Sequence, residues 1–225
     1  VSRADLWSSA LGVLPVLAIF LIVFGGIYGG VFTPTEGAAV GAAATFATAL
    51  LQRELNWHKF KQCFYSTAEA SAMIFMIFLG ADMLNSALAL SQAPNQLASF
   101  VGGLGLSPVA VIAAILVFYV LLGCVMDELS MILLTIPIFF PMMTSLDFGL
   151  SQEHMAIWFG ILVLIAVEVG LITPPVGLNL FVINAMDRTT PIVKTYSAVM
   201  WFVASDIIRI VILAAFPAIT LFLLT

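Results

Sequence analysis

The sequence predicts an all-α polytopic membrane protein, and two of its features support this class. Hydrophobic residues make up 63% of the 225 residues, whereas charged residues make up only 8%. Soluble domains carry about 25% charged residues, so this chain cannot cover a water-facing surface. The second feature is a series of long apolar runs separated by prolines, glycines and short polar stretches, which is typical of helices in a bilayer. We therefore expect a single membrane domain over residues 1–225.

Charge and composition also exclude several functions. The formal net charge is −5, so the chain has no basic face for the phosphates of a nucleic acid. The two cysteines lack metal-ligand spacing, and no His/Asp/Ser or metal-ligand group lies in the apolar runs. We therefore expect neither an enzyme nor a bound cofactor. The chain starts at Val1 without a recognisable signal peptide, and we expect it to be part of a longer protein.

Apolar runs and breakers predict eight helical segments, with boundaries good to a few residues. They are residues 11–31, 37–51, 63–90, 107–123, 129–143, 156–172, 177–186 and 197–224. Crossing a hydrocarbon core of about 30 Å takes about 20 residues, which the first, third and last segments provide. Two polar connections are also expected: an amphipathic stretch over residues 52–62 and a Gly/Pro-containing loop over residues 93–106.

The start of the chain shows two local signals. Thr33, Pro34 and Glu36 predict a turn with a capped helix start, because a hydroxyl followed three residues later by a carboxylate is typical of helix N-termini. Glycines at 25, 26, 29 and 30, together with the pair Gly37 and Gly41, have the small-residue spacing of closely packed helices.

Two later pairs of segments are irregular. Residues 129–143 cover only about 22 Å at 1.5 Å per residue, so residues 107–143 are expected to form a re-entrant hairpin. Two full spans remain an alternative for this pair. Residues 156–186 are too long for one straight span and contain Pro174 and Pro175. We interpret them as one crossing by a broken helix.

Basic residues then orient the chain. With residues 53–61 placed in the cytoplasm by the positive-inside rule, the N-terminus with Arg3 is cytoplasmic. The hairpin returns to the outer side, and the broken helix crosses inward. Every loop Lys or Arg then lies inside, Arg188 and Lys194 included, and the C-terminus lies outside. A single crossing over residues 107–143 would place Arg188 and Lys194 outside.

The first candidate site is the break over residues 170–179. Pro174 and Pro175 lack N–H groups, so the carbonyls before them lose their helical donors and need another partner inside a membrane. A sodium ion is one such partner, and the N-terminus of the following segment suits an anionic substrate group. The alternative is a plain proline kink. The candidate residues here are Gly170, Thr173, Pro174, Pro175, Gly177 and Asn179.

The second candidate site is the tip of the hairpin, with Gly123, Met126, Asp127 and Ser130. Adjacent carboxylates at 127 and 128 are costly in hydrocarbon and are usually functional or hydrated. Asp127 and Ser130 also fit the N-cap of the second hairpin arm, so a solvated cap is the alternative.

Other acids in apolar segments are open to several interpretations. Asp206 and Arg209 are three residues apart, which favours an internal ion pair. Glu168 lies about one turn before the break and could carry a proton or tune the break. Asp82, Asn85 and Ser86 form a polar stripe that faces either the site or the outer water.

Three segments together resemble one family. They are residues 24–40 with Gly25-Gly26-Ile27-Tyr28-Gly29-Gly30 and Thr33-Pro34-Thr35-Glu36, residues 126–141 ending in Leu134-Thr135-Ile136-Pro137-Ile138-Phe139-Phe140-Pro141, and residues 170–182 with Gly170-Leu171-Ile172-Thr173-Pro174-Pro175. They are similar to the C-terminal half of the large membrane subunit of TRAP transporters, the tripartite periplasmic solute importers. The resemblance covers essentially the whole chain.

The resemblance implies a mechanism and partners. It implies one of two inverted repeats of a sodium-coupled elevator transporter, with sodium held near Gly123, Gly170 and Thr173. It implies the N-terminal half of the same permease, a small membrane subunit and a periplasmic binding protein that delivers an organic acid, such as a dicarboxylate or sialic acid. The location implied is the bacterial inner membrane. A membrane scaffold that moves no solute is the alternative function, but a scaffold does not need a hairpin and a broken helix.

Overall fold

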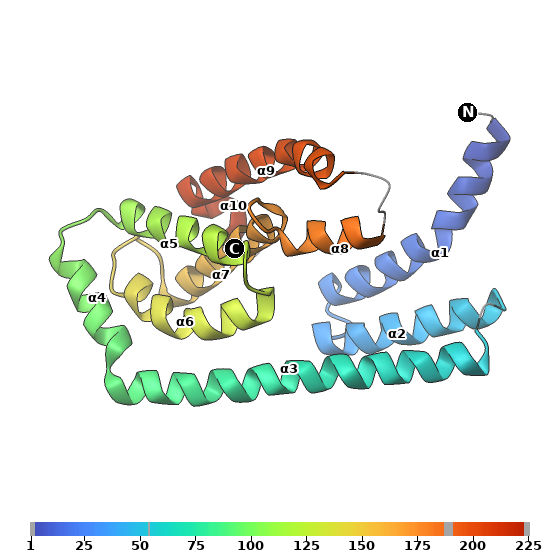
Figure 1. Cartoon of the computed structure of the whole chain (residues 1–225), viewed down its shortest axis with the longest axis horizontal. Coiled ribbons are helices and arrows are strands. Elements are labelled where there is room, and N and C mark those ends of the chain that lie inside the picture. The colour runs from blue at the N-terminus through green and yellow to red at the C-terminus, as the bar shows by residue number, and fades with distance from the viewer. Residues whose placement is uncertain (1–2, 54, 187–190, 223–225) are drawn as a thin grey trace. The chain divides into compact units, whose positions relative to one another are not determined.

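The computed structural model describes residues 3–53, 55–186 and 191–222, and within these ranges it contains helices and no strands (Figure 1). Three described helices are long and apolar enough to cross a membrane: α3 (Trp57–Ser91), α7 (Gln152–Ile172) and α9 (Ile192–Ala215). The predicted all-α polytopic class is confirmed. The chain forms two compact units, Val1–Ser71 and Ala72–Thr225, which are described separately.

Helices α1 (Arg3–Tyr28) and α2 (Pro34–Leu51) pack against each other in the first unit, as the glycine spacing predicted. Gly37 is buried, and a Cβ there would lie 2.9 Å from Cδ1 of Ile27. A Cβ on Gly41 would lie 3.4 Å from Cγ2 of Val23. The glycines therefore let the two helices approach closely.

The turn between α1 and α2 confirms the predicted helix cap. The Thr33 hydroxyl accepts the backbone N–H of Glu36, and Oε2 of Glu36 accepts the backbone N–H of Thr33 at 2.8 Å. This reciprocal pair is a capping box, which satisfies two N–H groups at the start of α2. The hydrogen bonds from the Thr33 backbone and hydroxyl to the exposed carboxylate hold the pKa of Glu36 below its usual 4.5.

Helix α3 begins earlier than the apolar run predicted. The predicted polar stretch over residues 52–62 ends at Asn56, whose Oδ1 accepts the backbone N–H of Lys59 at 2.8 Å. Because no proline or glycine follows until Gly80, the helix starts at Trp57 and continues to Ser91. Its 35 residues cover about 52 Å, far more than the hydrocarbon thickness of about 30 Å.

The predicted loop over residues 93–106 is wrong, because Ala93–Gly103 form helix α4. Pro94 lies in the first turn, where a missing N–H costs nothing, and the next breakers are Gly102 and Gly103. Gln92, with φ +56°, adopts a left-handed conformation and separates α3 from α4.

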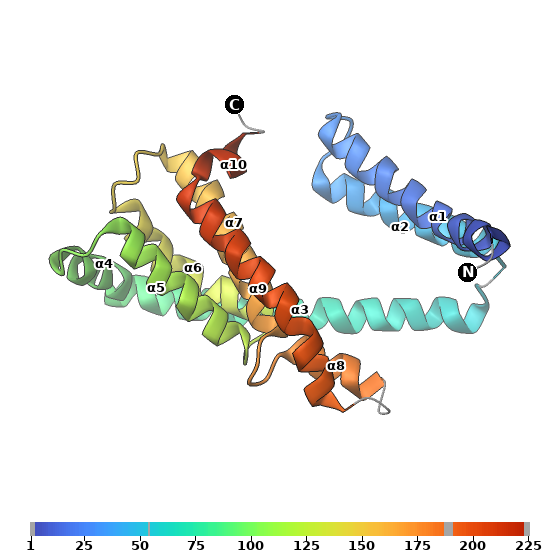
Figure 2. The same ribbon diagram turned by 90° about the horizontal axis from the view of Figure 1, so that it is seen from above.

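Helix α7 lies at the centre of the second unit (Figures 1 and 2), where α5 (Pro108–Gly123), α6 (Glu128–Thr144) and α9 pack around it. Helices α8 (Leu178–Met186) and α10 (Pro217–Leu221) also contact it. The almost fully buried side chains of α7 include Trp158, Phe159, Leu162, Val163 and Val167. Large apolar side chains therefore hold the helix that leads into the break.

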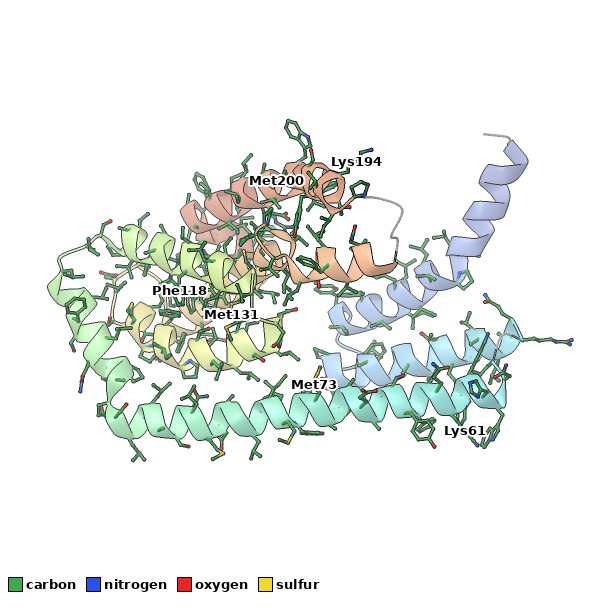
Figure 3. All side chains as sticks on the ribbon, in the orientation of Figure 1. Lys61, Met73, Phe118, Met131, Lys194 and Met200 are labelled. Carbon is green, nitrogen blue, oxygen red and sulfur yellow. The ribbon has the colours of Figure 1, made fainter. Side chains whose placement is uncertain are left out.

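Helices α5 and α6 are joined internally by buried hydroxyls. Oγ1 of Thr135 lies 2.6 Å from the Tyr119 hydroxyl and 2.6 Å from the Met131 carbonyl. Thr135 donates to the carbonyl and accepts from Tyr119, so both hydroxyls are satisfied. Met131 lies in the crowded region between the two helices (Figure 3). The hairpin is therefore one packed unit.

The predicted last helix, residues 197–224, differs at both ends. It begins at Ile192, and α9 ends at Ala215, because Pro217 interrupts it and starts α10. The expected pairing of Asp206 with Arg209 is present, since Nη2 of Arg209 lies 2.9 Å from Oδ1 of Asp206, but Arg209 is exposed and the pair is not internal. Three expectations concern parts of the chain that the structure does not describe. They are the positions of Arg188, of Leu224 and of the Arg3 side chain.

Candidate functional site

The two predicted site regions meet at Gly123 and Gly170. Gly123 ends α5, and Gly170 lies in the last turn of α7. A Cβ on Gly170 would lie 2.6 Å from Cα of Gly123 and 2.8 Å from the carbonyl of Val120. A Cβ on Gly123 would lie 2.9 Å from Cα of Gly170. Only glycine permits this backbone contact, which brings the hairpin tip beside the end of α7.

A buried thiol extends this contact to the break. Cys124 is 1% exposed, and its Sγ lies 3.2 Å from the carbonyl of Val120 and 3.7 Å from the carbonyl of Pro174. The thiol therefore lies between the last turn of α5 and the proline pair. From the sequence, Cys124 had no assigned role, because the two cysteines lack metal-ligand spacing. The one signal was its position directly after Gly123.

The acidic end of the hairpin tip serves as a helix cap. Oδ2 of Asp127 accepts the backbone N–H of Ser130 at 2.9 Å and begins α6. Asp127 is exposed, Glu128 is half-buried, and Met126 packs partly against the core. The cap interpretation of Asp127 and Ser130 therefore agrees with the geometry, and Asp127 is exposed at the tip.

The break itself has a defined conformation. Helix α7 ends at Ile172, Thr173 is extended, and α8 begins at Leu178. The backbone N–H of Thr173 donates to the carbonyl of Gly170 at 3.0 Å. Its hydroxyl donates to the carbonyl of Val169 at 2.5 Å. Gly177 is buried and has φ +58°, a conformation that a residue with a side chain adopts only under strain.

The prolines leave one carbonyl without a helical partner. The carbonyl of Leu171 would normally accept an N–H from residue 174 or 175, and both of these are proline. No hydrogen bond from another described residue reaches it. Leu171 is itself buried. Inside a membrane a carbonyl that has lost its helical donors needs another partner, and a dehydrated cation is one such partner.

A residue that sequence reasoning missed contacts the far end of the break. Tyr196, on the second turn of α9, places its hydroxyl 2.6 Å from the carbonyl of Val176 and 3.4 Å from the carbonyl of Pro175. Tyr196 was not among the residues that the sequence singled out. No sequence signal connected it with the break, because the contact joins residues 20 positions apart.

Other predicted candidates lie apart from this junction. Asn179 is exposed in the first turn of α8, and Glu168 is exposed on α7. Asp82 and Ser86 are also exposed, whereas Asn85 faces α6. Asn184 of α8, which the sequence analysis did not single out, has a buried amide oxygen without a hydrogen-bond partner among the described residues.

The arrangement therefore combines neutral oxygen groups at one junction. Backbone carbonyls and the hydroxyl of Thr173 lie at the end of α7, beside the glycine contact with the hairpin tip. Neutral oxygens of this kind suit a weakly charged hard cation such as sodium. Immediately after them, α8 starts with N–H groups that favour an anion.

Comparison with known proteins gives a consistent result. Residues 1–219 match the family described as "Tripartite ATP-independent periplasmic transporter, DctM component". The chain is 33% identical, over 98% of its own length and 50% of the relative's, to a C4-dicarboxylate TRAP transporter large permease protein of Pseudomonas aeruginosa. It is 31% identical, over 92% of its length and 32% of the relative's, to an isethionate TRAP transporter permease protein of Oleidesulfovibrio alaskensis.

A third relative is named for a different substrate. The chain is 26% identical to a sialic acid TRAP transporter large permease protein of Vibrio cholerae, over 99% of the chain and 51% of the relative. The chain thus spans about a third to a half of the length of these curated relatives.

Proposed function

Because this chain belongs to the DctM component family of tripartite ATP-independent periplasmic transporters, we propose that it supplies one half of a permease that imports an organic acid together with sodium. The observation that carries this proposal is the backbone contact between Gly123 and Gly170. It places a helix-hairpin tip beside a helix break, as in secondary transporters with discontinuous helices. A scaffold that only packs against a partner has no use for such a junction.

We place the sodium ion at this junction, near Gly123, Gly170 and Thr173. The supporting features are the carbonyl of Leu171, to which no described residue donates, and the Thr173 hydroxyl within the same turn. The hydroxyl already donates to Val169, so its lone pairs remain free to meet a cation. Sodium would hold the hairpin tip and the break together and would thereby couple ion binding to the geometry of the substrate site.

We place the organic acid on the other side of the break, at the start of α8. The first N–H groups of α8 follow Gly177 and form the positive end of the helix dipole. The named relatives carry C4-dicarboxylates, isethionate or sialic acid, so an organic anion fits both the family and this helix terminus. Pro174, Pro175, Gly177 and Asn179 would line this part of the site, with Met126, Asp127 and Ser130 on the hairpin side.

The remaining parts of the transporter follow from the family. We propose that the chain works in the bacterial inner membrane with the N-terminal half of the same permease, a small membrane subunit and a periplasmic binding protein. One relative is named DctMQ, a combined designation that is compatible with a joined small subunit. In this proposal residues 107–143 re-enter the membrane, and residues 156–186 cross it as a broken helix that moves with the hairpin in an elevator step.

Uptake measurements test the proposal. The complete permease that carries this chain is reconstituted in proteoliposomes with its partner subunit and binding protein. Labelled succinate, isethionate and sialic acid are supplied with an inward sodium gradient or with an equal potassium gradient. We expect uptake of one of these acids only with sodium. Equal uptake in both gradients would refute sodium coupling, and no uptake of any organic acid would favour the scaffold alternative.

A further inference from the structure

The break between α7 and α8 is held from two sides by side chains of other helices. On one side the thiol of Cys124, after α5, lies 3.7 Å from the carbonyl of Pro174. On the other side the hydroxyl of Tyr196, on α9, lies 2.6 Å from the carbonyl of Val176. The tyrosine contact is the stronger one, because 2.6 Å is a short O–H···O distance and a thiol is a weak donor.

The hydroxyl of Tyr196 has a single proton to donate. At 2.6 Å the carbonyl of Val176 takes this proton, and the carbonyl of Pro175 at 3.4 Å is a secondary neighbour. A carbonyl oxygen has two lone pairs, so the hydrogen bond fixes the direction of the Val176 carbonyl and leaves the second lone pair available. The tyrosine therefore orients this oxygen without removing it from other partners.

The orientation of the Val176 carbonyl affects the rest of the break, because Val176 lies between a stiff and a flexible part of the backbone. Before it, Pro174 and Pro175 have φ fixed near −65° by their rings, so this part of the backbone is stiff. After it, Gly177 has φ +58° and no side chain, so its own backbone angles are less restricted than those of the prolines. The peptide between Val176 and Gly177 is thus the most flexible part of the break. A hydrogen-bond donor at the Val176 carbonyl fixes the orientation of this peptide.

The same peptide lies close to Thr173. A Cβ on Gly177 would lie only 3.3 Å from the carbonyl of Thr173, so the loop closes tightly on itself. Rotation of the Val176–Gly177 peptide would therefore change the surroundings of the Thr173 carbonyl. The side chain that fixes Val176 thereby acts on the surroundings of the Thr173 carbonyl at the end of α7.

We propose that Tyr196 is a positioning residue of the cation site, whose hydroxyl, through the Val176 carbonyl, sets the direction of the oxygens in the break. This inference rests on the sodium-coupled function proposed above. It assigns α9 a direct part in ion binding, although α9 contributes no oxygen of its own to the ion.

Tyr196→Phe tests the inference, because it removes the hydroxyl and keeps the ring. Uptake by the complete reconstituted transporter is measured against sodium concentration. We expect the sodium concentration at half-maximal uptake to rise about fivefold, which corresponds to about 1 kcal/mol at 1.4 kcal/mol per tenfold change. The maximal rate at saturating sodium should change by less than about twofold, since the oriented site is still formed when sodium is abundant. Tyr65→Phe, an exposed tyrosine on α3, is the matched control and should leave the sodium curve unchanged.

A second measurement separates positioning from a merely structural role. Thr173→Ala alone should also raise the sodium requirement, because it removes a hydroxyl at the same junction. If Tyr196 acts through the break, the two changes together should raise the requirement by less than the product of the single effects. Sodium-dependent thermal stabilisation, measured on the purified folded fraction, gives the same comparison even when the yield of a variant is low.

The outcomes are distinguishable. A sodium-independent wild-type transporter would refute the proposed function and this inference with it. A sodium-dependent wild type whose curve is unchanged by Tyr196→Phe would refute only the role of Tyr196. A lower maximal rate or yield with an unchanged sodium requirement would show that the hydroxyl stabilises the fold and does not position the site.

Discussion

Asn85 on α3 donates from Nδ2 to the backbone carbonyl of Leu133 on α6 at 3.3 Å. Leu133 lies four residues before Pro137, so this carbonyl has no helical N–H to accept. Asn85 therefore supplies a donor that the proline removed. Nε1 of Trp158 does the same for the carbonyl of Leu213, which lies four residues before Pro217, at 2.8 Å.

The break differs from these two pairs in its described hydrogen bonds. At Leu133 and Leu213 a side chain from another helix replaces the missing backbone donor. At Leu171, whose would-be donors are both proline, no other described residue does so. The carbonyl of Leu171 therefore remains available to the ion proposed above.

The first prediction concerns Asn85. Asn85→Ala should lower the free energy of unfolding of the purified permease by about 0.5–1.5 kcal/mol, because the carbonyl of Leu133 loses its donor. Thermal unfolding in detergent measures the change. Ser86→Ala, at the exposed neighbouring position, should have almost no effect. Equal stability of the two variants would mean that Asn85 contributes nothing to the packing of α6.

The second prediction concerns the glycine contact. Gly170→Ala places a methyl group 2.6 Å from Cα of Gly123, and backbone atoms cannot give way as a flexible side chain would. We expect a loss of about 1–3 kcal/mol of stability and the loss of sodium-dependent uptake. Gly160→Ala lies on the same helix with no atom within 4 Å of its Cβ, so it should keep uptake and match or exceed wild-type stability. Normal uptake by the Gly170 variant would separate this contact from the site.

The third prediction distinguishes an ion site from a kink. Replacing both Pro174 and Pro175 by alanine should let α7 and α8 join, because the restored N–H groups would bond the free carbonyls. Folding should survive, since alanine favours helix, but uptake and the sodium-dependent thermal shift should be lost. If the permease has a second sodium site, only one component of the shift should disappear. Pro108→Ala, at the first turn of α5, is the control and should behave as wild type. Full uptake by the double variant would show that the prolines only kink the chain.

The fourth prediction tests the orientation. In a Cys63→Ser background, single cysteines at the exposed residues Asn95 and Ser151 should react with an impermeant thiol reagent added to intact cells. A cysteine at exposed Gln52 should react only after the membrane is opened. Cys124 is buried and can remain in place. Strong outside labelling at position 52 would reverse the proposed topology.

The fifth prediction follows from the lowered pKa of Glu36. A carboxylate whose pKa is lowered in the folded state stabilises that state fully above its unfolded value of 4.5, and this contribution is lost as the pH falls through the lower folded value. The stability difference between wild type and Glu36→Gln should therefore be constant above pH 4.5 and shrink below it. Thermal unfolding at several pH values measures this difference. A difference that stays constant down to pH 3 would mean that the Glu36 carboxylate does not stabilise the folded state.

The sequence by itself determined the helical membrane class and the local helix starts. Composition excludes a water-facing surface, and the caps at Thr33 and Asp127 depend on residues only three positions apart. The ion pair between Asp206 and Arg209 could be predicted for the same reason. Such interactions are local, so the spacing of residue types is sufficient to predict them.

Helix ends were harder to predict from the sequence where polar composition and the absence of helix breakers favoured different boundaries. The polar stretch before α3 and the segment of α4 have the composition of connections, yet both are helical from Trp57 and from Ala93 onward. A helix continues through polar residues when no proline or glycine stops it and its ends are satisfied. Polarity alone therefore does not mark the end of a helix.

Only the tertiary structure decided how the site is assembled. The contact of Gly123 with Gly170, the thiol of Cys124 at Pro174 and the hydroxyl of Tyr196 at Val176 each join residues that are 20 to 50 positions apart. Sequence spacing carries no information on such pairs, because they depend on which faces of α5, α7 and α9 pack together. The sequence showed that carbonyls near Pro174 lose their donors, and the packing of the helices determined which of those carbonyls gained a new one.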